Sequence, residues 1–206
     1  MRGPDRAQNP TTEEELRAAT LGGPTELNGP ILLSPSDPAW PVQFAREEAK
    51  IRAALGGRAL AVEHVGSTSV PGLAAKPILD LVLAVADSAD EAAYVPALEA
   101  AGYRLLIREP AWEEHRLLTG RQPDVNLHVF SAGAREITLM LRMRDWLRAN
   151  AADRALYATT KQALAARTWK YVQHYADAKT TVISEILARA EAAAPSPGEG
   201  AARAGR

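Results

Sequence analysis

The stretch that decides the fold reads EHVGSTSVPGLAAKPILD and spans residues 63–80. It closes the apolar segment 60–65 with a glycine and a serine, and it leads into residues 78–85, the nearly continuous apolar run ILDLVLAV. Such a run is typical of a central strand that is buried on both faces of a sheet. Asp80 is the only charged residue in it. The sequence therefore predicts a loop between two strands, with a lone carboxylate in the second.

The segments on either side predict a mixed sheet followed by helices. Residues 125–130 alternate in the period-two manner of a half-buried strand, whereas residues 40–55 repeat apolar side chains at helical spacing and end at two glycines. We therefore expect an α/β (α+β) fold: a mixed β-sheet core flanked by helices, with a helical C-terminal third. The expected strands are residues 31–33, 60–65, 78–85, 104–107, 115–118 and 125–130, and the expected helices are residues 40–55, 90–102, 137–149, 152–166 and 172–190.

Composition divides the chain into one domain and two extensions. The 206 residues, 47% of them hydrophobic, suffice for one well-buried domain, which we place at residues 30–190. Residues 1–29 hold many glycines, prolines and asparagines around one helix candidate, 12–17, so we expect a mostly flexible arm. Residues 191–206 contain no aromatic or branched apolar residue, which predicts a disordered Ala/Pro/Gly tail.

Charge and composition exclude several classes of function. The 24 lysines and arginines balance 25 acidic residues, so the chain lacks the basic field of a dedicated nucleic-acid binder, and a small-molecule or nucleotide ligand is favoured over nucleic acid. The absence of cysteine excludes disulfides and thiolate metal sites. No segment reaches the roughly 20 apolar residues of a membrane span, and no signal peptide is evident. We expect a cytoplasmic protein without a membrane partner, and the sequence leaves its oligomeric state open.

The 63–80 stretch supplies the first candidates for a site. A strand that ends in Gly66 and Ser67 can present backbone N–H groups and a hydroxyl to an anion, although the same pair is a common turn signal. The carboxylate of Asp80 needs a cation, hydrogen-bond donors or water to offset its desolvation. Pairing with Lys76 at a strand end is the structural alternative.

Later segments supply further candidates. His128 lies two residues after Asn126 on the strand 125–130 and would share a cleft with Asp80 if the two strands are neighbours; otherwise it is a hydrogen-bonded packing residue. The mixed-charge run EEHR, residues 113–116, is more typical of a surface turn. The C-terminal helices add side chains that line a cleft or form a solvated helix face, namely Arg144, Asp145, Tyr157, Lys161, Tyr175 and Lys179.

Five segments in this order and spacing resemble the GrpB family. The resemblance covers roughly residues 31–190. The family is related in fold to the nucleotidyltransferase superfamily, which includes the polymerase-beta-like enzymes, and its members also occur fused to dephospho-coenzyme A kinase. The five segments are DPAW (37–40), the 63–80 stretch, NLHVF (126–130), RDWLRAN (144–150) and YADAK (175–179).

The resemblance implies a nucleotidyltransferase-like core that binds a nucleotide or another phosphorylated small molecule and transfers a nucleotidyl or related group to a small acceptor. A nucleoside triphosphate would face Gly66, Ser67 and Thr68. Mg²⁺ or Mn²⁺ would be held by two carboxylates, separated by one residue, on the following strand. Asp80 fills the first of these positions, whereas Val82, which cannot bind a metal, fills the second.

This departure leaves three interpretations of the site. In the first, the site is a single-metal transferase in which Asp80 and His128 bind the metal. Either Glu63 or His64 completes it, because successive strand residues face opposite sides of a sheet. We take Glu63 as the third catalytic candidate.

The second and third interpretations need no metal. In the second, a lysine neutralises phosphate while Asp80 or His128 acts as a general base, which gives a metal-independent transferase or ligase. The candidate lysines are Lys76, Lys161 and Lys179. In the third, the chain is a non-catalytic ligand-binding or regulatory module that retains the fold and an anion-binding cleft.

Overall fold

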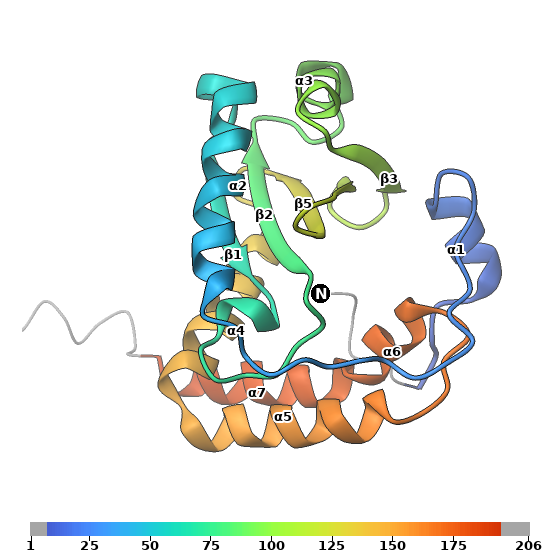
Figure 1. Ribbon diagram of the computed structural model, residues 1–206, viewed down its shortest axis with the longest axis vertical. Helices are drawn as coiled ribbons and strands as arrows, with labels where there is room; N and C mark the ends of the chain where they lie inside the picture. The colour runs from blue at the N-terminus through green and yellow to red at the C-terminus, as the bar shows by residue number, and fades with distance from the viewer. Residues whose placement is uncertain (1–7, 195–206) are drawn as a thin grey trace, which may run out of the picture.

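Five strands form one mixed sheet in the computed structural model, which describes residues 8–194 (Figure 1). Their order across the sheet is β1-β2-β5-β4-β3. β2 and β5 run parallel, and the other neighbouring strands pair antiparallel. The predicted mixed sheet is therefore confirmed, with β2 in its interior. The strands are β1 (Ala61–Val65), β2 (Leu79–Val85), β3 (Arg104–Glu109), β4 (His115–Gly120) and β5 (Val125–Ser131).

Seven α-helices surround the sheet within the part of the chain that the structure describes. Figure 1 shows α2 along one face of the sheet and α4, α5 and α7 packed together at its lower end. The predicted helical C-terminal third is confirmed. The helices are α1 (Glu13–Ala19), α2 (Ala39–Leu55), α3 (Val95–Ala100), α4 (Arg135–Ala149), α5 (Ala151–Ala165), α6 (Val172–Ala178) and α7 (Thr180–Ala192).

α2 begins and ends where the sequence predicts. The side chain of Asp37 accepts a hydrogen bond of 2.8 Å from the backbone N–H of Ala39. Pro38 fits beside it because the first turn of a helix needs no intrahelical N–H donor. Gly56 closes the helix with a φ of 57°, which glycine adopts readily. These signals fix the length of the helix that covers the main core.

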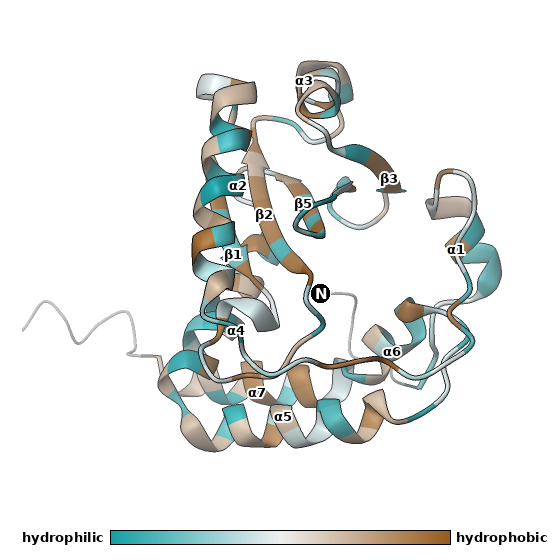
Figure 2. Ribbon diagram, viewed as in Figure 1, coloured by the Kyte–Doolittle hydropathy of each residue, from teal (hydrophilic) through white to brown (hydrophobic). Residues whose placement is uncertain are grey.

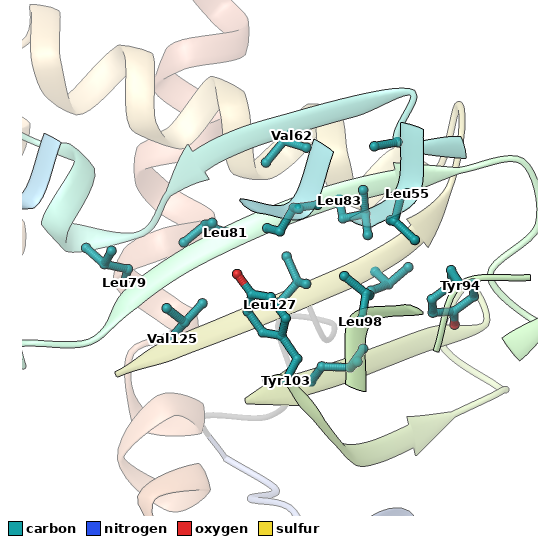
Figure 3. Packing of buried hydrophobic residues seen from close by; sticks show 14 of the residues in the cluster. Leu55, Val62, Leu79, Leu81, Leu83, Tyr94, Leu98, Tyr103, Val125 and Leu127 are labelled. Carbon is teal, nitrogen blue, oxygen red and sulfur yellow. The ribbon is translucent and has the colours of Figure 1, made fainter. Parts of the chain in front are cut away.

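The side chains of β2 alternate between two different surroundings. Leu79, Leu81 and Leu83 point towards α2 and join the main core, drawn in Figure 3. Asp80 and Val82 point to the opposite face, where Val82 packs in a cluster that includes side chains of α4. Figure 2 shows β2 as mainly hydrophobic. The lone carboxylate of this strand therefore faces the C-terminal helices.

The expected strand 31–33 is wrong. The backbone N–H of Ile31 donates a 2.9 Å hydrogen bond to the carbonyl of Ala165 at the end of α5, and Ile31 packs against Ala165 and Tyr175. A carbonyl in the last turn of a helix lacks an intrahelical donor. The segment supplies that donor, so its apolar side chains cover a helix end and do not extend the sheet.

Two expected helices are shorter than the sequence indicates. The helix expected over 90–102 consists of a 3₁₀ turn, Glu91–Ala93, followed by α3, because Pro96 belongs in a first helical turn. The helix expected over 172–190 is divided at Lys179 into α6 and α7. Four consecutive β-branched residues, 180–183, lower the helix propensity at this point.

The arm is packed where the structure describes it, which corrects the expected flexibility for residues 8–29. Thr12 caps α1 through a capping box, which confirms the helix candidate. Leu16 is only 7% exposed, and the backbone N–H of Leu21 donates a 2.8 Å hydrogen bond to the carbonyl of Leu106 on β3. The composition predicted a flexible arm because ordering it costs conformational entropy. Burial of Leu16 and backbone pairing with β3 offset that cost.

Residues 1–7 and 195–206 lie outside the described residues, so the flexible start of the arm and most of the disordered tail stay predictions. α7 extends to Ala192. Between residues 8 and 194, no helix combines the length and the hydropathy needed to cross a membrane.

Candidate functional site

Asp80 lies near the start of β2, between the strands on either side. It is opposite Val65 on β1 and opposite Asn126 on β5. The side-chain amide of Asn126 donates a 2.9 Å hydrogen bond to Oδ1 of Asp80. The neighbouring strand thus provides one of the donors that the partly buried carboxylate requires.

Gly66 brings the loop backbone directly against Asp80. Its φ and ψ of 66° and −168° belong to a region that is essentially restricted to glycine. A Cβ at this position would lie 2.8 Å from the Cβ of Asp80. Ser67 and Thr68 follow in a 3₁₀ turn, and Oγ1 of Thr68 is 2.9 Å from Nε2 of His64. The Gly-Ser signal therefore marks a turn that closes over the carboxylate.

Three lysines from different parts of the chain meet Asp80 in one pocket. Lys76 comes from the loop before β2, Lys161 from α5 and Lys179 from the junction of α6 and α7. Lys161 is 3% exposed, and its Nζ donates a 2.7 Å hydrogen bond to the carbonyl of Ala74. The polar residues that line the pocket are Ser67, Thr68, Lys76, Asp80, Lys161, Tyr175 and Lys179.

Burial makes the charged form of each of these lysines unfavourable. It lowers the pKa of Lys161 to about 7, the charge of Lys179 lowers it further, and Asp80 opposes the change. The pKa of Lys76 and that of Lys179 are also lowered, first by burial, and Asp80 again opposes the change. Because Asp80 is the one carboxylate among the residues that line this pocket, an added anion would stabilise the charged forms of the three lysines.

The residues around Asp80 do not fit a divalent metal. Val82, at the second carboxylate position, is buried with Val65 and Phe130. Within residues 8–194, no group of three or more histidine, cysteine, aspartate or glutamate side chains could hold a metal ion. Three ammonium groups in the same pocket would repel a cation, and a divalent metal needs several oxygen ligands. The donor set therefore speaks against Asp80 and His128 as metal ligands.

Neither Glu63 nor His64 completes the predicted metal site. Oε2 of Glu63 accepts a 2.8 Å hydrogen bond from Nη1 of Arg144. The ring of His64 lies on the other face of β1 and stacks on Phe44 of α2, with 4.9 Å between the ring centroids. Alternation along the strand separates the two residues, as expected. The catalytic role expected for Glu63 has no support from its position, because its carboxylate is held in an ion pair with α4.

His128 ends a chain of hydrogen bonds that crosses the sheet. Oε2 of Glu109 lies 2.8 Å from Nδ1 of His115, and Nε2 of His115 lies 3.0 Å from Nδ1 of His128. A carboxylate accepts only, so Nδ1 of His115 donates to Glu109. With both rings neutral, Nε2 of His115 accepts from Nδ1 of His128. Nε2 of His128 then carries no proton and keeps its lone pair. His128 lines a larger chamber together with Asp80.

This assignment predicts the tautomer of His128. Burial is the largest cause that lowers the pKa of His128 to about 4, so its ring should stay neutral between pH 5.5 and 8. Long-range ¹H–¹⁵N NMR correlations should show Nδ1 protonated and Nε2 unprotonated. In His115→Phe, which removes the acceptor, the preference for that tautomer should be lost. A His128 ring protonated at Nε2 in the unmodified protein would contradict the assignment.

The structure brings together most of the predicted site residues but adds two that the sequence did not single out. Glu109 and His115 were missed as site residues, since we took the run EEHR, in which His115 lies, as more typical of a surface turn. His115 is the first residue of β4, as the expected strand 115–118 predicts, but it is only 2% exposed. Its signal was the period-two pattern that places His115, Leu117 and Thr119 on one face of the strand.

Comparisons with known proteins identify the family. The GrpB protein family matches residues 30–189. A UPF0157 protein of Halalkalibacterium halodurans is 57% identical over 183 residues, which are 89% of this chain and 94% of that protein. A dephospho-CoA kinase of Mycolicibacterium paratuberculosis is 30% identical over 187 residues, 78% of this chain but only 46% of the kinase.

A solved structure gives the same result. The crystal structure of conserved protein GrpB from Enterococcus faecalis superposes with a TM-score of 0.66 at 31% sequence identity and covers 77% of this chain and 96% of that one. The family match spans most of the described residues, including the Gly66 turn, all three lysines of the pocket, His115 and His128. From the sequence match and the shared structure together, it follows that this chain belongs to the GrpB protein family.

Proposed function

We propose that the chain binds a phosphate-bearing small molecule, with a nucleotide among the candidates, and transfers a group from it to a small acceptor without a resident metal. The observation that carries this proposal is the pocket in which Lys76, Lys161 and Lys179 surround the single carboxylate of Asp80. Lysine ammonium groups are strong donors to phosphate oxygens, and such hydrogen bonds are worth more in a buried site. The similarity to part of a dephospho-CoA kinase supports a phosphorylated ligand.

Each group of the site has a role in this proposal. The lysines neutralise the phosphate and the charge that develops on the leaving oxygen. Asp80 partly offsets the charge of the lysines while the site is empty. The acceptor hydroxyl gives its proton to Nε2 of His128 as its oxygen forms the new bond to phosphorus, and the bond to the leaving oxygen breaks. His115 and Glu109 orient the base, as the third group of a catalytic triad does.

A non-catalytic binding module is the second candidate. It is favoured by Val82, which is fully buried among apolar side chains where a metal-dependent transferase would need a carboxylate. The two candidates share the anion-binding pocket and differ in turnover. Metal-independent turnover of a phosphate ester that is lost in His128→Gln would decide for the transferase, because that substitution leaves the lysine pocket intact.

Titration calorimetry with inorganic phosphate, pyrophosphate and ATP tests the proposal. We expect binding in the presence of EDTA, with little change when Mg²⁺ replaces it. Because a bound anion favours the charged form of Lys161, whose free pKa is about 7, binding near pH 8 should take up protons. The measured enthalpy should then vary with the ionisation enthalpy of the buffer. The proposal fails if none of the three ligands binds, or if binding requires the metal.

The same lysine gives a pH dependence of stability. Between pH 7 and 10.5 the unfolded chain binds a proton at Lys161 that the folded chain lacks, so this residue makes the free energy of unfolding rise with pH. Its contribution is at most about 1.4 kcal/mol per pH unit. Urea unfolding at pH 7.5 and 9 should show a smaller rise in Lys161→Met than in the unmodified protein. Identical slopes in the two proteins would contradict the lowered pKa.

A further inference from the structure

We infer that the ligand is a phosphate ester with an apolar body, whose phosphate lies among the three lysines and whose apolar part fills an adjoining chamber. This inference rests on the proposed function and names the class of substrate for the same site. It follows from the size of the two cavities, from the wall that they share and from the side chains that line the larger one.

The lysine pocket is too small for more than the phosphate itself. Its volume is about 50 Å³, whereas sites for small organic molecules usually measure about 300–1,000 Å³. The adjoining chamber measures about 510 Å³ within the described part of the chain. A phosphate in the pocket therefore leaves the rest of its ligand to the chamber.

The two cavities are continuous at the site residues. Lys76, Asp80 and Lys179 line both of them. The ester oxygen of a phosphate held by these lysines would lie at this shared wall, so its substituent would extend into the chamber. His128 lines the chamber too.

Apolar side chains from separate elements form most of the chamber wall. They come from the arm, from β4 and from the helices α4 and α7, so the fold gathers them without any one segment being unusually apolar. Methionine adapts to ligands of different shape. Of the polar side chains that also line it, Asn126, Arg144 and Gln173 already donate hydrogen bonds to other side chains of the protein. A ribose or a base would need several fixed hydrogen-bond partners that are not engaged in this way. The apolar residues of the wall include Leu16, Leu117, Met140, Met143, Leu147 and Ile183.

Calorimetry with phosphate esters of increasing chain length tests the inference. In EDTA, affinity should increase from inorganic phosphate to butyl phosphate to octyl phosphate, by about fourfold for each buried methylene. Octanol, which has the chain without the charge, should bind at least tenfold more weakly than octyl phosphate. ATP should bind more weakly than octyl phosphate.

A variant that fills the chamber tests binding of the alkyl chain separately from binding of the phosphate. Ala176 of α6 lines the chamber but not the lysine pocket. Ala176→Phe should abolish the gain with chain length and leave the affinity for inorganic phosphate unchanged; Ala176→Leu, which is easier to accommodate, should reduce the gain in part. Ala155→Phe, at an exposed position of α5, is the matched control and should change neither affinity.

The outcomes distinguish this inference from the proposed function. Equal affinity for phosphate, butyl phosphate and octyl phosphate would overturn the apolar class and leave the anion site standing. Tighter binding of ATP than of octyl phosphate would overturn it in favour of a nucleotide. If octyl phosphate and octanol bind equally and phosphate does not bind, the lysines hold no anion, and both proposals fail.

Discussion

Gly66→Ala is expected to lower the free energy of unfolding by about 3 kcal/mol and to weaken phosphate binding at least tenfold. The φ and ψ at this position are strained for any residue with a Cβ, which contributes about 1–3 kcal/mol. The added methyl would also lie 2.8 Å from the Cβ and 3.0 Å from the Cγ of Asp80. Because Asp80 is held in β2 and by Asn126, the loop must move away from it. That movement would displace Ser67 and Thr68 from the lysine pocket.

Gly72→Ala is the matched control for this prediction. Gly72 lies in the same loop with a φ of 79°, and nothing lies within 4 Å of the position of its Cβ. This variant also places a Cβ on a residue with a positive φ, but without the contact with Asp80. We expect it to lose about 1–2 kcal/mol and to keep its phosphate affinity. Urea unfolding and calorimetry of both variants provide the comparison, and equal losses of affinity would show that the contact between Gly66 and Asp80 does not support the site.

The sequence predicted the sheet because local pattern and environment agree along β2 and β5. The apolar run 78–85 requires burial on both faces, and the structure provides it in the interior of the sheet. Asp80 stood out for the same reason, since it is the one residue that contradicts the run. Val82 was equally informative, because an apolar residue at the expected second carboxylate position already argued against a metal.

The sequence named Lys76, Lys161 and Lys179 as candidates to neutralise a phosphate, but it could not predict that all three meet at Asp80. They are separated by 85 and 18 positions along the chain. Only the packing of α5 and of the junction between α6 and α7 against the loop before β2 brings them together. The packing of the arm was missed for a similar reason: its stability comes from contacts with β3 and not from its own composition.

Lys179→Met is expected to weaken phosphate binding by about tenfold to a hundredfold, because a hydrogen bond from a charged donor contributes about 1.5–3 kcal/mol. The same substitution should leave the folded state as stable or more stable. Burial lowers the pKa of Lys179, which shows that its charge is unfavourable in the empty site. Its Nζ lies 4.5 Å from the centre of the Tyr175 ring, and a methionine sulfur also contacts aromatic rings favourably.

Lost phosphate binding combined with retained stability would identify Lys179 as a functional residue. Substitution of a lysine that stabilises the fold would lower the free energy of unfolding as well. Lys170→Met is the matched control: Lys170 is 45% exposed and pairs with Glu13 of α1. That variant should bind phosphate normally and lose a little stability through the missing ion pair. Calorimetry and urea unfolding measure both quantities. If Lys179→Met binds phosphate as tightly as Lys170→Met does, the pocket does not use this lysine for an anion. If Lys179→Met unfolds more easily than Lys170→Met, the role of Lys179 is to stabilise the junction of α6 and α7.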